Sequence, residues 1–302
     1  MRYSQAIFKI KLKKWWALMA LTILVLTTGC QVQDKESSKK SITVSILPEK
    51  YFVDRISGNR YDVHVIIPPG ANHEAFDPTP RQIQDLENSI VYFRIGYFEF
   101  EPVLTKELES INKKLMIVNV AGGIELIHTG DEDHLTEGLA GVDPHIWLSP
   151  VEVKTMVSNI YHTLITIDPD QASLFEGNYN QLINELDSLD KKLIPLFQNA
   201  RLRKFIIYHP ALGYLARDYG LEQIPIEREG KNPSPAYLRN IIDLARKDNI
   251  RTILIQKEFD INNARAVADG INGTLVIIDP MAYDWFKNMT AVTTILVTAL
   301  NP

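Results

Sequence analysis

The stretch FEGNYNQLINELDSLDKKLIPLF (residues 175–197) decides the expected fold of this 302-residue chain. Its apolar residues recur at steps of four and three, the spacing of one face of a helix. The pattern predicts one long helix that begins near Asp168 and Pro169, and about thirty helical residues make a rod of roughly 45 Å. A rod of that length can run along two lobes, although an ordinary core helix of a second domain would give the same pattern.

Alternating strand and helix patterns lie on both sides of this helix. The predicted strands are Ile42–Leu47, Val63–Ile67, Ile90–Ile95 and Leu115–Val120, then Phe205–Tyr208, Gln223–Ile226, Thr252–Ile255 and Leu275–Ile278. The predicted helices are Glu49–Ile56, Pro80–Glu87, Phe100–Ser110, Ala211–Tyr219, Pro235–Lys247, Asn262–Ile271 and 285–302. Such alternation predicts an α/β fold with two lobes, each a four-stranded parallel sheet flanked by helices, joined by one long backbone helix.

The first 29 residues differ in composition from the rest. Five basic residues precede an apolar run, Trp15 to Leu26, that is too short to span a bilayer comfortably. This arrangement predicts a secretory signal peptide. Cys30 is the only cysteine, and the sequence LTTGC (26–30) resembles a bacterial lipobox, although Thr27 stands where leucine is usual. We therefore expect Cys30 to be lipidated; the alternative is a free thiol beside an uncleaved anchor.

These patterns give the expected domain boundaries. We expect a signal peptide at 1–29, a polar lipidated tether at 30–40, an N-terminal lobe at 41–168, the linking helix at 169–199 and a C-terminal lobe at 200–302.

Composition excludes some classes of function. A hydrophobic content of 45% and a charged content of 23% are those of a folded globular protein rather than a disordered one. A formal net charge of −5 offers no basic field for nucleic acid. The signal region carries five basic and no acidic residues, so the chain without it has a charge of −10, which suits capture of cations.

Three histidines lie in loops or at strand ends: His73, His145 and His209. Asp279 closes the last predicted strand. Ligands of open α/β sheets bind beyond the carboxyl ends of the strands, so groups from both lobes can meet in one cleft. Three imidazoles and one carboxylate suit zinc, whereas calcium and magnesium prefer oxygen.

Three motifs carry a resemblance to a known family: GANHEAFDPTP (70–80), DPHIWLSP (143–150) and HPALGY (209–214). In order and register they are similar to the zinc and manganese substrate-binding proteins of ABC importers, the cluster with a rigid helical backbone. The likeness runs from about Ser41 to Met289. It implies capture of Zn²⁺ outside the cytoplasm, without enzyme activity, for delivery to a membrane permease and its ATPase.

The resemblance also implies the metal ligands. His73, His145 and His209 match the family's first three ligands, and Asp279 matches its late carboxylate. A histidine at the third position is more usual of zinc binders, and glutamate of manganese binders. Some zinc binders use water in place of the late aspartate, so both remain open for the fourth position. Manganese stays the alternative cargo.

The chain departs from the family pattern at two places. Many zinc members carry a long histidine-rich loop before the second ligand; here a short loop keeps His128 and His134, which could gather a second, weaker ion or form a solvated acidic loop. Zinc members often have an acidic residue before the first ligand, where this chain has Asn72. The aromatic residues Phe98 and Trp147 could shield the cleft or belong to the core.

Two further classes of function stay open. A zinc hydrolase would keep three protein ligands and an open water position, but the sequence has no His-Glu-x-x-His motif. A surface adhesin would use the metal to stabilise its lobes. The favoured interpretation is a monomeric, lipid-anchored protein of the cell envelope, periplasmic or on the cell surface.

Overall fold

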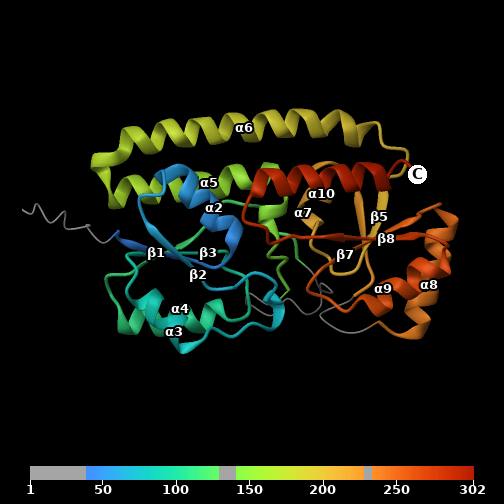
Figure 1. Ribbon diagram of the computed structural model, residues 1–302, viewed down its shortest axis with the longest axis horizontal. Helices are drawn as coiled ribbons and strands as arrows, with labels where there is room; N and C mark the ends of the chain where they lie inside the picture. Colours follow the sequence, from blue (N-terminus) through green and yellow to red (C-terminus); the bar gives the residue numbers. More distant parts are fainter. Residues whose placement is uncertain (1–38, 129–140, 228–232) are drawn as a thin grey trace, which may run out of the picture. The chain divides into compact units, whose positions relative to one another are not determined.

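Two parallel four-stranded sheets form the framework of the protein. The structure, a computed structural model, describes residues 39–128, 141–227 and 233–302. The first sheet has the order β2-β1-β3-β4 and the second the order β6-β5-β7-β8, so each lobe repeats one topology (Figure 1). The strands are β1 (Ser41–Val44), β2 (Asp62–Val65), β3 (Val91–Arg94), β4 (Met116–Asn119), β5 (Lys204–Ile207), β6 (Glu222–Pro225), β7 (Thr252–Gln256) and β8 (Thr274–Ile278). The expected two-lobed α/β fold is confirmed.

Helices cover both sheets. They are α2 (Leu47–Ser57), α3 (Pro80–Glu87), α4 (Glu101–Ile111), α5 (Pro150–Ile167), α6 (Ala172–Gln198), α7 (Gly213–Asp218), α8 (Pro235–Lys247), α9 (Ile261–Gly270) and α10 (Trp285–Ala299). Short 3-10 turns occur at η1 (His73–Ala75), η3 (Ile146–Leu148) and η4 (Pro169–Gln171). Within the described ranges, no helix is both long enough and apolar enough to cross a membrane.

The long helix α6 contacts both lobes. It packs against α2 and α5 of the first lobe and α10 of the second, and Figure 1 shows it running alongside α5 and α10. At 27 residues it is about 40 Å long. Its buried residues are Phe175, Leu182, Leu186, Leu193 and Phe197, which belong to the predicted apolar stripe. The alternative of a core helix confined to the second lobe is therefore wrong.

The first strand ends earlier than its apolar run predicts. The run extends to Leu47, but β1 stops at Val44 and Leu47 already begins α2. Glu49 Oε2 accepts hydrogen bonds from the backbone N–H groups of Ser45 (2.8 Å) and Ile46 (3.0 Å). The side chain of Glu49 thus caps the start of α2 with the backbone N–H groups that directly follow β1.

An apolar interface holds the two lobes together. One buried cluster includes Ile42 of β1, Phe175 of α6 and Ile207 of β5. Within it, the Trp147 indole N–H donates to the carbonyl of Pro280 (2.8 Å), and the Trp285 indole N–H donates to the carbonyl of Trp147 (2.7 Å). Both indoles are almost fully buried. These two bonds fix the segment after His145 against the segment after β8.

Candidate metal site

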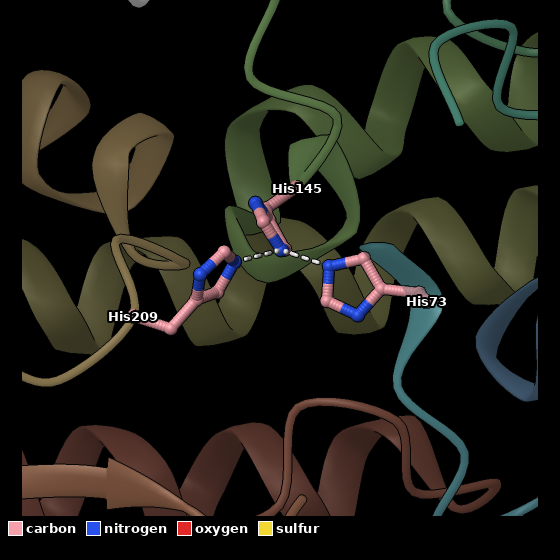
Figure 2. Close-up of side chains that lie close together, drawn as sticks. All are labelled: His73, His145 and His209. Atoms are coloured by element: carbon pink, nitrogen blue, oxygen red, sulfur yellow. Dashed lines mark hydrogen bonds between the residues drawn. The ribbon is translucent and has the colours of Figure 1, made fainter. Parts of the chain in front are cut away.

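Three histidine rings meet where the lobes face each other. His73 opens η1, His145 directly precedes η3, and His209 follows β5. Nε2 of His145 lies 2.9 Å from Nε2 of His73 and 3.3 Å from Nε2 of His209 (Figure 2). Nitrogen ligands of one tetrahedral zinc ion lie about 3.3 Å apart. The three rings thus present three nitrogens at nearly the separation that one ion requires.

Local hydrogen bonds position each histidine. The Asn72 side chain accepts the backbone N–H of Glu74 (2.9 Å) and so shapes the turn at His73. The Gln256 side chain accepts the backbone N–H of His209 (3.3 Å) and donates to its carbonyl (2.7 Å), which ties the end of β7 to the loop after β5. His145 is fixed by Asp143 instead.

Carboxylates contact the other ring nitrogens of two histidines. Nδ1 of His145 lies 2.7 Å from Asp143 Oδ1. Nδ1 of His209 lies 3.2 Å from Glu227 Oε2 and 3.4 Å from Glu74 Oε1. A carboxylate at Nδ1 places the proton there and leaves Nε2 free to bind metal. This arrangement matches the outer shell of metal-binding histidines in proteins.

Burial favours the neutral form of His73 and His145. The three residues are 2–4% exposed. Burial lowers the pKa of His73 well below its usual value, and the neighbouring charges of His145 and His209 act in the same direction. Burial also lowers the pKa of His145, against the opposing effect of Asp143. A metal binds neutral imidazole, so both rings are prepared to act as ligands.

Asp279 does not join this group. The three histidines have ligand atoms within 4.8 Å of one another, and Asp279 is not part of that set. Its Oδ2 lies 2.5 Å from the Lys257 ammonium, and its Oδ1 accepts the backbone N–H of Met281 (3.0 Å). Both oxygens are therefore occupied by protein donors.

Comparison with known proteins identifies the family. The model of ZnuA, the periplasmic component A of a zinc-uptake complex, matches residues 42–299. The chain belongs to the ZnuA family. The high-affinity zinc uptake system protein ZnuA of Bacillus subtilis is 27% identical over 284 residues, which cover 89% of each chain.

Solved structures of ZnuA show the same fold. A crystal structure of ZnuA has 34% identity and a TM-score of 0.80, covering 87% of this chain and 99% of that one. A ZnuA deletion mutant with zinc bound has 34% identity and a TM-score of 0.79, covering 87% and 98%. The three-histidine cluster of this chain therefore lies in the framework of a substrate-binding transport protein.

Aromatic residues enclose the three rings. Phe98 lies 5.6 Å from the His73 ring and Trp147 lies 5.1 Å from the His145 ring, measured between centroids. Phe98 is 2% exposed and Trp147 is 0% exposed. Both side chains therefore belong to the core, and both also shield the three rings from solvent. Phe259 stacks on His209 at 4.8 Å and 14°. Phe259 was not predicted; it lies in the loop after β7.

Sequence reasoning also missed the carboxylates. Glu74, His209 and Glu227 form a second group whose ligand atoms lie within 4.8 Å. Burial raises the pKa of Glu74, and Glu227 adds to that effect. Glu227 follows the end of β6, so the strand-end rule applied to His209 and Asp279 could have found it.

The other histidines within the described residues, His64, His128 and His162, are not part of the cluster. His128 is exposed and pairs with Val142 in an isolated antiparallel bridge. His134 and Cys30 lie outside the described residues, so the auxiliary metal loop and the lipid anchor stay predictions. His64 lies 3.6 Å from Asp62 in β2, and His162 is exposed on α5.

Proposed function

We propose that this chain captures Zn²⁺ outside the cytoplasm and delivers it to the permease of an ABC importer. The observation that carries the proposal is the convergence of three buried Nε2 atoms, from His73, His145 and His209, between the lobes. Uncharged nitrogen donors favour zinc over the harder manganese ion. The names of the ZnuA relatives and the zinc-bound ZnuA structure support the same cargo.

The fourth ligand decides how tightly the ion is held. Asp279 can reach the ion only if it gives up the contacts with Lys257 and the Met281 N–H, each of which occupies one carboxylate oxygen. A water molecule is the other candidate expected from the family. In either case the buried imidazoles supply most of the donor set.

We further propose that the chain carries the zinc ion and does not use it to catalyse a reaction. The membership of a family named for zinc uptake supports this assignment. A permease and its ATPase are the proposed partners of a monomeric protein. The proposed domain boundaries are a signal peptide at 1–29, a tether at 30–40, lobes at 41–168 and 200–302, and the linking helix at 169–199.

Lipidation of Cys30 is the proposed means of retention at the cell envelope. Cys30→Ser should abolish partition of the processed protein into detergent, because the thioether-linked lipid can no longer form. Partition that persists in this variant after signal removal would rule out the anchor.

Elemental analysis and competitive titration of the purified protein test the zinc assignment. We expect one tightly bound zinc ion per chain, held more tightly than manganese. A preference for manganese would change the cargo, and the absence of tight binding would reject the transport proposal.

A further inference from the structure

A groove with acidic walls lies on the surface of the first lobe. It has a volume of about 460 Å³ and is bounded by the segment after His73 and by helices α3 and α4. No lysine or arginine in the described part of the chain lines it. The carboxylates that line it are those of Glu74, Asp77, Glu99 and Glu107. The groove therefore concentrates negative charge on this face of the lobe.

Three of the four carboxylates have no cationic partner. Asp77, Glu99 and Glu107 are exposed, and none of them forms a salt bridge with a residue in the described ranges. Water solvates a single exposed carboxylate well, so the charge alone does not mark a binding surface. What distinguishes this groove is the apolar floor between its acidic walls.

Aromatic and aliphatic side chains form that floor. The rings of Phe76 and Phe100 meet edge to face with centroids 5.8 Å apart. Val103 of α4 also lines the groove and is 65% exposed, the largest value among the large apolar side chains of the described ranges. An apolar centre with a charged rim is the usual composition of a surface that binds another protein.

The groove ends at the proposed metal site. Glu74 directly follows His73, and its Oε1 lies 3.4 Å from Nδ1 of His209. From the floor, Phe100 stacks on Phe98, which in turn packs against the His73 ring. Figure 1 shows α3 and α4 on the opposite side of the first sheet from α6. A partner bound in the groove would thus lie beside the ion and clear of the long helix.

Charge argues against the chain itself as the occupant. The segment 129–140 contains four acidic residues and no lysine or arginine, and a second copy of the chain has a net negative charge. Like charges repel across an interface, whereas a basic partner is steered toward an acidic surface. The groove therefore favours a separate protein that presents basic and apolar side chains together.

We propose that this groove is the docking surface for the permease that receives the ion. A segment of the permease packs an apolar side chain on Phe76 and Phe100. Its basic side chains pair with Asp77, Glu99 and Glu107. This inference rests on the proposed function, because a permease that accepts the ion must bind where the ion leaves.

Two groove variants and two matched controls test the docking surface. Glu107→Lys reverses a charge of the rim, and Val103→Asp places a charge on the floor. The controls are Glu176→Lys and Leu174→Asp, which alter exposed residues of α6 outside the groove. Each variant replaces the full chain in its native host, and the uptake of radioactive zinc by zinc-starved cells is measured.

Both groove variants should lower zinc uptake by about 5–10-fold, while both controls take up zinc as the wild type does. The purified groove variants should keep wild-type zinc affinity, because neither residue contacts the three histidines. Mutations elsewhere in the genome that restore uptake to Glu107→Lys should fall in a membrane permease and replace one of its basic residues.

Several outcomes would overturn the docking surface. Wild-type uptake in both groove variants, with uptake lost in His145→Ala, would remove the groove and leave the carrier proposal standing. Weakened zinc affinity in the purified groove variants would assign the defect to capture instead. Restoring mutations confined to this chain, or a wild-type dimer that Glu107→Lys dissociates, would assign the groove to the chain itself. Zinc uptake that does not depend on the chain at all would reject the carrier function.

Discussion

Asp143 Oδ1 contacts His145 twice, at Nδ1 (2.7 Å) and at the backbone N–H (2.9 Å). One oxygen thereby fixes both the ring and the backbone of the central histidine, whose Nε2 lies within 3.3 Å of Nε2 of both other histidines. Asp143 is itself 4% exposed, and its carbonyl accepts the hydroxyl of Tyr214 (2.8 Å). The second lobe, through α7, therefore supports a ligand of the first.

We expect Asp143→Asn to weaken zinc binding by about 10–100-fold, because the neutral amide loses the charge that keeps the proton on Nδ1. Competitive titration with a chelator measures this change. The matched control is Asp62→Asn, which alters an exposed carboxylate 3.6 Å from His64 outside the cluster. Equal zinc affinity in the two variants would show that Asp143 has no part in the site.

Gly213 permits the close approach of α7 to this carboxylate. A Cβ atom at Gly213 would lie 2.5 Å from Asp143 Oδ2, too near for the buried side chain to stay in place. We therefore expect Gly213→Ala to lower both zinc affinity and the free energy of unfolding. Gly177→Ala in α6 is the control, since nothing lies within 4 Å of its Cβ.

Helix propensity alone should make the Gly177 control more stable by about 1 kcal/mol. Urea denaturation and chelator competition report the two quantities separately. A Gly213→Ala variant with wild-type zinc affinity would contradict the proposed support of His145 from α7.

The histidine pKa shifts predict how stability depends on pH. Burial lowers the pKa of His73 and His145 in the folded state, whereas an unfolded histidine titrates near about 6.5. Below that pH the unfolded chain binds protons that the folded chain does not. The metal-free protein should therefore lose stability as pH falls from about 7 to about 5.

Urea denaturation at several pH values, with chelator present, tests this dependence. His73→Gln should flatten the loss of stability over that window, because one of the shifted groups is gone. His162→Gln, which removes an exposed histidine on α5, should keep the wild-type slope. A wild-type slope in His73→Gln would refute the effect of burial.

The sequence predicts the framework well where local signals agree. Helices α3 and α8 have the predicted bounds, because Thr79 and Ser234 cap them and a proline occupies each first turn. Helix α5 carries the same signals at Ser149 and Pro150. Apolar runs overstate strand length because they continue into buried loops and caps.

The site is predictable only in part. The strand-end rule and the family motifs select His73, His145 and His209, which the fold brings together. The pairing of Asp279 with Lys257 joins residues 22 positions apart, each directly after one of two adjacent strands, and no local pattern encodes it.

The most direct test of the account is zinc titration of His145→Ala against the wild type and His162→Ala. His145 is the central ligand of the proposed set, so its loss should weaken zinc binding by at least about 100-fold while the circular dichroism spectrum stays that of a folded protein. His162→Ala should bind zinc as the wild type does. Undiminished zinc affinity in His145→Ala would contradict the proposal that the three-histidine cluster captures the ion.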